Sequence, residues 1–238
     1  MKLSAIILTL GEYDLAKQCM TTLRENMDIK DDWEVILASQ NHDNSKDSMF
    51  NKCRIIKIDG NVGYSRGNNI AVKEADGEYI VILNDDFVFK QKMFSKLFEL
   101  YDKYDKIGNV SPVLFDHLHN RLWSYSILDH ETGEPALKGG IGGFAELEYG
   151  EYCPPFLIPK KIYEEVGGFD ERYYPFNYED VDFNVKLRIN DYKIMVRGDC
   201  VLDHIGSQTV LKVWKGQLTK YHTENKQRFK DKWGTFNI

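Results

Sequence analysis

The segment from Tyr79 to Phe89 places the strongest constraint on the fold. It reads Tyr-Ile-Val-Ile-Leu-Asn-Asp-Asp-Phe-Val-Phe, so an uncharged run of β-branched, aromatic and long aliphatic residues stops at Asn84, Asp85 and Asp86. A run of this kind is typical of a strand that is buried on both faces of a sheet. The acids therefore lie at the carboxyl edge of the sheet, where ligands bind in open α/β structures.

The two adjacent carboxylates of Asp85 and Asp86 have no Lys or Arg as an immediate neighbour. They repel each other unless a cation joins them, so the hypothesis is that Asn84 and Asp86 face a divalent metal ion that carries a diphosphate. The alternative is a solvated turn after a strand, because Asn and Asp are ordinary turn residues. Spacing alone does not separate the two.

The segments around this strand alternate between strand and helix patterns. Short apolar runs predict strands, and apolar residues at intervals of three and four predict helices. The alternation implies parallel strands joined by right-handed crossovers, as in a nucleotide-binding half. Strands are expected at residues 3–10, 34–38 and 54–58, and helices at 15–27, 65–75 and 92–104.

The second half of the chain is less regular. Proline and glycine interrupt every pattern between residues 107 and 156, which predicts loops and short strands on the acceptor side, with mobility at 138–144. Asp116, His117 and His119 are interpreted as part of a polar loop, with a metal site as the alternative. Beyond this stretch we expect helices at 159–166 and from 178, and strands at 193–196 and 200–202.

Residues 208–234 have the pattern of an amphipathic helix rich in aromatic and basic side chains. Seven Lys and Arg residues against Glu224 and Asp231 leave the segment with an excess of five positive charges. Three interpretations stay open: core packing with a solvated face, contact with a membrane surface that presents a lipid-linked acceptor, or contact with a nucleic acid or another anionic acceptor.

Length and composition are those of a globular protein. The 238 residues are 42% hydrophobic, and the net charge of -6 argues against a general affinity for nucleic acid or anionic lipid. Four scattered cysteines favour a reducing, cytoplasmic compartment, and no apolar run approaches the ~18 residues of a membrane span. We expect one domain, with a nucleotide-binding half at 1–106, an acceptor-binding half at 107–207 and a basic aromatic helix at 208–238.

Six motifs occur in a characteristic order: Ile-Ile-Leu-Thr, Asn-Val-Gly-Tyr-Ser-Arg-Gly-Asn-Asn, Leu-Asn-Asp-Asp, Val-Gly-Gly-Phe-Asp-Glu, Tyr-Glu-Asp-Val-Asp-Phe and Asp-His-Ile-Gly-Ser. Together they resemble the family 2 glycosyltransferases of the GT-A fold, and most of all the rhamnosyltransferase-like members. Lys-Trp-Gly at residues 232–234 is also common in that family. The resemblance covers nearly the whole chain and implies an α/β fold with a mostly parallel central sheet flanked by helices.

The resemblance implies transfer of a hexosyl or deoxyhexosyl group, with inversion, from a nucleotide diphosphate donor to a hydroxyl acceptor such as a glycan or a lipid-linked saccharide. Asn84, Asp85 and Asp86 match the family's Asp-x-Asp signature, from whose acidic form Asn84 departs. His204 matches a histidine that reaches the same Mg²⁺ or Mn²⁺ ion. Oxygen ligands suit Mg²⁺, and an imidazole shifts the preference toward Mn²⁺. The residues alone would instead favour a strand-end histidine bonded to Asp203.

Asp180 matches the family's catalytic base, which removes the acceptor proton. The resemblance then leaves Glu179 to orient the acceptor and Asp182 as the reserve candidate for the base. The alternative is that these carboxylates only interact favourably with the helix dipole, since all three stand in the first turn of the predicted helix. Both interpretations can hold together.

Several positions match those around the nucleotide in the family: Thr9, Ser39, Asn61, Gly63, Arg66 and Asn69. Ser39 stands where many relatives have an Asp that holds the base, and Gly11 replaces the usual Asn, so the identity of the nucleotide stays open. Arg66 stands at a predicted helix N-terminus, where its side chain contacts either a phosphate or only solvent.

Two other classes of function stay open. The departures at Gly11, Ser39 and Asn84 are compatible with a degenerate module that binds a sugar nucleotide without turning it over. A nucleotidyltransferase would use similar acids on a similar sheet. It would need a glycine-rich loop with Lys or Arg after the first strand, whereas residues 10–13 carry an acid there.

Overall fold

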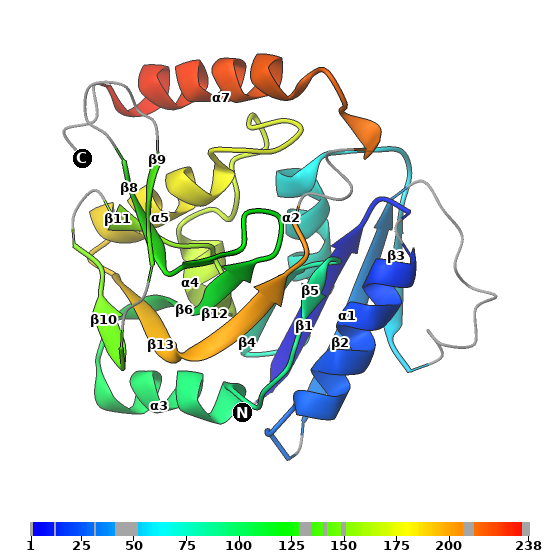
Figure 1. The fold of residues 1–238 in the computed structure, drawn as a ribbon, viewed down its shortest axis with the longest axis vertical. Coiled ribbons are helices and arrows are strands. Elements are labelled where there is room, and N and C mark those ends of the chain that lie inside the picture. Colours follow the sequence, from blue (N-terminus) through cyan, green and yellow to red (C-terminus); the bar gives the residue numbers. More distant parts are fainter. Residues whose placement is uncertain are drawn as a thin grey trace.

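The protein is built on one large sheet with helices on both faces (Figure 1). The computed structural model describes residues 2–11, 13–30, 32–40, 52–128, 135–139, 142–148, 151–206 and 212–234. The order of strands along the main path of the sheet is β10-β13-β6-β12-β4-β1-β2-β3. In the described residues, no helix combines the length and apolar character needed to cross a membrane.

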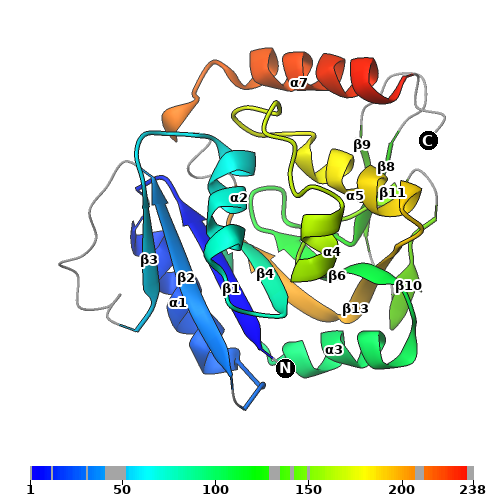
Figure 2. The ribbon, with the colours of Figure 1, turned by 180° about the vertical axis from the view of Figure 1, so that it is seen from behind.

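The first half has the expected alternation. Strands β1 (Leu3–Thr9), β2 (Trp33–Gln40), β3 (Arg54–Ile58) and β4 (Tyr79–Asn84) pair in parallel, in the order β4-β1-β2-β3. Helix α1 (Tyr13–Asn26) covers one face of the sheet, and α2 (Tyr64–Glu74) covers the other (Figure 2). Because these strands run in parallel, their carboxyl ends meet at one edge, which carries Asn84.

The second half is more regular than the sequence predicts. Residues 107–116 form one long strand, β6 (Ile107–Asp116), rather than loops and short strands. The two strands expected at 193–196 and 200–202 are a single strand, β13 (Lys193–His204), parallel to β6. Pro112 faces Arg197, where the register between the two strands shifts, so the N–H that proline lacks is missing at an irregular point.

The remaining strands are short. β12 (Leu157–Pro159) lies antiparallel between β4 and β6, and β5 (Phe87–Val88) pairs with the end of β13. β7 (Arg121–Trp123) and β10 (Phe144–Glu146) extend the large sheet, while a small second sheet holds β8 (Tyr125–Leu128), β9 (Pro135–Lys138) and β11 (Glu151–Tyr152). Part of the stretch 138–144, for which mobility is expected, lies outside the described residues.

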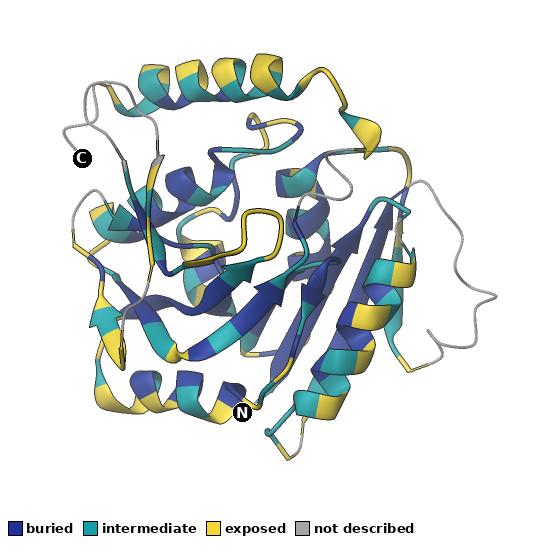
Figure 3. Ribbon diagram, viewed as in Figure 1, coloured by how far each residue is buried: buried dark blue, intermediate teal, exposed yellow. Residues whose placement is uncertain are grey.

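The helices of the second half are α3 (Phe94–Lys103), α4 (Lys160–Glu165), α5 (Glu179–Ile189) and α7 (Leu218–Trp233). One hydrophobic core joins α1 and α3 to the sheet, and another joins α2, α4 and α5 to its opposite face (Figure 3). The expected C-terminal helix begins only at Leu218, and residues 208–211 lie outside the described part.

A third, smaller core lies under α7. Phe229 is fully buried there against Tyr173, Tyr178 and Val181, which belong to α5 and the loop before it. Of the three interpretations of the C-terminal segment, core packing is thus confirmed for the apolar face of α7. Contact of its basic face with a membrane or an anionic polymer stays a prediction.

Candidate active site

The turn after β4 carries the two acids into the protein rather than into solvent. Asp85 is only 7% exposed and Asp86 only 5% exposed, so the alternative of a solvated turn is wrong. The chain continues directly into β5, which pairs with the end of β13 and sets Phe87 opposite His204. This pairing brings Nε2 of His204 to 3.2 Å from Oδ1 of Asp86.

His204 and Asp86 are held from several sides. The other carboxylate oxygen of Asp86 accepts a hydrogen bond from the N–H of Gly206, at 3.2 Å. The ring of Phe87 meets the imidazole edge-to-face, with centroids 5.2 Å apart. Burial lowers the pKa of His204, but the contact with Asp86 outweighs it and leaves the pKa above its usual value. Asp203, the expected alternative partner of His204, instead pairs with His117 and Lys90.

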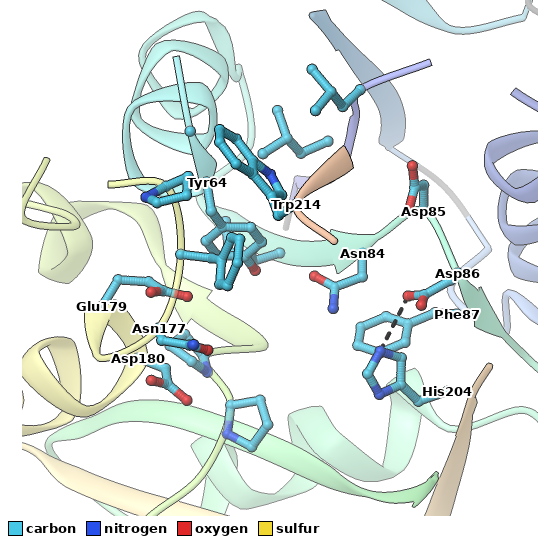
Figure 4. Close-up of a pocket in the computed structure, with 18 of the residues that line it drawn as sticks. Tyr64, Asn84, Asp85, Asp86, Phe87, Asn177, Glu179, Asp180, His204 and Trp214 are labelled. Carbon is cyan, nitrogen blue, oxygen red and sulfur yellow. Dashed lines mark ion pairs between the residues drawn. The ribbon is translucent and has the colours of Figure 1, made fainter. Parts of the chain in front are cut away.

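These residues fit a divalent cation. Two neighbouring ligands of an octahedral ion, each at about 2.1 Å from the metal, lie about 3 Å apart, which is close to the 3.2 Å between Asp86 and His204. The carboxamide of Asn84 faces the same space (Figure 4). No group of three or more His, Cys, Asp or Glu residues gathers as a metal site in the described ranges. Water and substrate oxygens would therefore complete the coordination, as is usual for Mg²⁺.

Helix α5 supplies carboxylates from the other side of the same cavity. Asn177 and Tyr178 adopt left-handed conformations, with φ of 74° and 71°, and end the preceding loop where α5 begins. Glu179 and Asp180 then stand across the cavity from Asp86 and His204 (Figure 4). Residues that are far apart in the sequence thus converge on one space of about 650 Å³, within the usual range for a small-ligand site.

The two carboxylates on α5 have different electrostatic environments. Burial raises the pKa of Asp180 to about 6, although backbone N–H groups, including that of Val181 at 2.8 Å, oppose the change. Burial and then the charge of Asp180 raise the pKa of Glu179 well above its usual value. Oε2 of Glu179 has no hydrogen-bond partner in the described part of the chain. Burial thus disfavours the charge of both carboxylates, and more strongly that of Glu179, which is the less exposed of the two.

Only some of the residues predicted around the nucleotide line this cavity. Asn61 and Gly63 do, together with Asn84 and Asp85. Asn61 accepts a hydrogen bond from the N–H of Gly63 at 3.1 Å and so shapes the loop before α2. A side chain at Gly63, where φ is +83°, would come within 2.8 Å of the Tyr174 ring, so this close approach requires glycine.

The other predicted nucleotide residues are placed elsewhere. Asn69 uses both ends of its carboxamide within the fold, donating to the carbonyl of Phe169 and accepting from the hydroxyl of Tyr163. The side chain of Arg66 is 60% exposed and lies 3.9 Å from Glu171, which agrees with the alternative of a surface charge. Thr9 and Ser39 are buried and are not among the residues that line the cavity.

Asp182, the reserve candidate for the base, also faces away from the cavity. Its side chain is fully buried, and Oδ1 accepts hydrogen bonds from Tyr173, Lys232 and Trp233. A carboxylate that is engaged in this way does not meet an acceptor. The structure thus separates Asp182 from Glu179 and Asp180, although all three belong to the first turn of α5.

Sequence reasoning missed a part of the cavity wall. Gln40 follows Ser39 at the end of β2, and its side chain accepts a hydrogen bond from the N–H of Val62 at 2.8 Å. The only signal for Gln40 in the sequence is its position as a polar residue at the end of an apolar run. Aromatic residues from two loops line the opposite part and form a cluster with no local motif. The missed residues of the wall include Gln40, Tyr64, Phe176, Asn177, Trp214 and His222.

Comparison with known proteins agrees with this geometry. The sequence model of the family described as Glycosyl transferase family 2 matches residues 4–166. No curated protein matches the chain significantly. Among solved structures, GalNAc-T7 with UDP, GalNAc and Mn²⁺ superposes with a TM-score of 0.66 at 10% identity, over 87% of this chain and 44% of that chain.

A second solved structure, TarS from S. aureus, superposes with a TM-score of 0.62 at 16% identity, over 97% of this chain and 42% of that chain. This chain therefore spans less than half the length of both proteins. At such low identities the likeness shows the fold alone, and it confirms the expected GT-A fold with a mostly parallel sheet.

Proposed function

The chain belongs to glycosyl transferase family 2, and from this premise we propose that it is a metal-dependent, inverting glycosyltransferase. It would move a sugar from a nucleotide diphosphate donor to a hydroxyl acceptor. One observation carries the proposal: a single cavity holds Asp86 and His204 on one side and Asp180 on the other. A transfer that inverts the anomeric carbon needs the leaving group and the base on opposite faces of the sugar.

The donor side of the proposal rests on Asp86, His204 and Asn84, which would hold Mg²⁺ or Mn²⁺. When bound, such an ion supplies Lewis-acid stabilisation of the negative charge on the departing diphosphate. The solved GalNAc-T7 structure contains UDP and Mn²⁺, which supports the same donor chemistry here. Asn61, Gly63 and Gln40 shape the adjoining wall, which we assign to the nucleoside.

The acceptor side of the proposal rests on Asp180. Its ionised carboxylate takes the proton from the acceptor hydroxyl while that oxygen forms a bond to the anomeric carbon. The bond from that carbon to the diphosphate oxygen breaks on the opposite face, so the configuration inverts. In its protonated form, which burial favours, Glu179 donates a hydrogen bond that orients the acceptor beside the base.

The test is a panel of UDP-, GDP- and dTDP-sugars, including dTDP-rhamnose, with Mn²⁺ or Mg²⁺ and without acceptor. We expect slow release of nucleoside diphosphate from one donor class and loss of this release when EDTA removes the metal. A panel that yields no product under any condition favours a binding module. The donor that reacts also tests the rhamnosyltransferase-like assignment.

The rate of this reaction should depend on pH through Asp180. Because a base must be ionised, the turnover number should rise with pH along an acid limb with an apparent pKa of about 6 and level off above it. The change Glu179→Gln should leave the limb near the same pH, since burial raises the pKa of Glu179 well above its usual value and so disfavours its charge. Initial rates across the range measure the limb, and a midpoint near the ordinary aspartate value of about 4 would contradict the burial of Asp180.

A further inference from the structure

The C-terminal Lys-Trp pair has no part in the mechanism so far, yet both side chains reach one residue of α5. Nζ of Lys232 lies 2.6 Å from Oδ1 of Asp182, and Nε1 of Trp233 donates to the same oxygen at 2.8 Å. Lys232 also lies 2.8 Å from Oδ2 of Asp170. These contacts join α7 to a helix that lies about 50 residues earlier in the chain.

Asp182 is held by side chains from three parts of the chain: the loop before α5, α5 itself and α7. Its side chain is 0% exposed, the Tyr173 hydroxyl donates to Oδ1 at 3.1 Å, and Lys186 lies 3.4 Å from Oδ2. With Asp170, the cluster balances two carboxylates against Lys186 and Lys232, while Arg172 pairs with Asp170 at the surface. Removing one of the two lysines leaves part of this buried negative charge uncompensated.

A second set of contacts fixes the chain just before the catalytic pair. The ring of Phe229 on α7 packs against Tyr178, with centroids 5.8 Å apart. Asn225 donates hydrogen bonds to the carbonyls of Tyr174 and Phe176, at 3.3 and 2.7 Å. Helix α7 therefore contacts Tyr178, the residue before Glu179, and it also binds Asp182 in the first turn of α5.

We propose that Lys232 and Trp233 are positioning residues for Asp180, which act through Asp182 to fix the first turn of α5 in the active site. The inference rests on the proposed role of Asp180 as the base. It gives the Lys-Trp pair a part in turnover beyond closing the small core under α7.

The charge balance offers a readout that packing alone would not change. Asp180 is faced by Glu179 on its own helix, by Tyr64 from α2 and by the thiol of Cys153, and burial raises the pKa of all three groups, which disfavours their charged forms. Loss of Lys232 removes one of the two ammonium groups beside Asp182, so that more negative charge stands within one helical turn of Asp180. We then expect the pKa of Asp180 to rise above its value of about 6.

The experiment compares Lys232→Met with Lys232→Arg and with the matched control Lys220→Met, an exposed lysine on the same helix. Turnover and donor KM are measured with the sugar nucleotide that the wild type hydrolyses fastest. The pKa of Asp180 is measured by carboxyl ¹³C NMR, with the resonance identified by its absence from Asp180→Asn. Urea unfolding establishes that each variant is folded.

For Lys232→Met we expect turnover to fall by about tenfold to a hundredfold, donor KM to stay within about twofold, and the pKa of Asp180 to rise. Lys232→Arg should restore most of the turnover, and Lys220→Met should behave as the wild type. A folded Lys232→Met with wild-type turnover and an unchanged Asp180 pKa would overturn the proposal.

The proposal stays testable if Lys232→Met does not fold or if the wild type shows no hydrolysis. If Lys232→Met does not fold, Trp233→Phe, which removes one hydrogen bond to Asp182, is judged by the same readouts. If the wild type hydrolyses no sugar nucleotide, the proposed function fails. The ¹³C titration then still decides whether Lys232 controls the environment of Asp180.

Discussion

Replacing Asp180 with Asn is expected to lower the turnover number by about a hundredfold to ten-thousandfold, the range attributed to general-base catalysis. Asn cannot take the acceptor proton, but it keeps the shape of the side chain at the start of α5. Donor affinity should change little, because the proposed donor site at Asp86 and His204 lies across the cavity from Asp180. Steady-state turnover and calorimetric titration with nucleoside diphosphate and Mn²⁺ measure the two effects separately.

A matched control is Asp191→Asn, an exposed aspartate just beyond the same helix that should leave turnover unchanged. Stability provides a second control. Burial raises the pKa of Asp180, which means that the fold disfavours its charge, so Asp180→Asn should leave the unfolding free energy unchanged or higher. Near-wild-type turnover in Asp180→Asn, or an equal loss of donor binding, would remove Asp180 from the role of base.

Replacing Asp86 with Ala is expected to abolish metal-dependent turnover and to weaken donor binding in the presence of Mn²⁺ by at least about a hundredfold. Mutating a residue that only hydrogen-bonds to a metal ligand already lowers metal affinity or activity by about tenfold to a hundredfold. Asp86 is proposed as a direct ligand, so its loss should cost at least as much. Its loss also leaves His204 without the carboxylate at 3.2 Å that holds the imidazole. Calorimetric titration with Mn²⁺ and nucleoside diphosphate measures the change.

The metal itself provides the control for this prediction. In EDTA, wild type and Asp86→Ala should bind the nucleoside diphosphate with the same low affinity, because both then lack the ion. Folding is compared by urea unfolding. If Asp86→Ala kept turnover that Mn²⁺ or Mg²⁺ stimulates, the ion would have to be bound somewhere else.

Local pattern was sufficient for the first half of the fold. Buried parallel strands are continuous apolar runs, so β1 and β4 could be read from the sequence, together with the carboxyl edge at Asn84. The same reasoning failed for β6, because Pro112 and the glycines and prolines further along the chain suggested loops. Its pairing with β13 depends on contacts some ninety residues apart, which no local pattern contains.

In the candidate site, too, some residues could be predicted from the sequence and others are revealed only by the fold. Asp86, His204 and Asp180 came from motifs, and the structure brings all three to one cavity. Asp182 stands in the same motif as Asp180, and only the fold reveals that its carboxylate turns toward Lys232. Trp214 could not be found from the sequence, since a tryptophan in a basic amphipathic segment has the same pattern whether it packs in a core or lines a site.

The central claim is that one cavity holds the departing diphosphate on one face of the sugar and a base on the other. The most direct test is to follow wild-type protein, Mg²⁺ and the reactive sugar nucleotide by ³¹P and ¹H NMR before the released sugar mutarotates. The account predicts free nucleoside diphosphate and a sugar whose anomeric configuration is opposite to that of the donor. Nucleoside monophosphate, pyrophosphate or a retained configuration would contradict it.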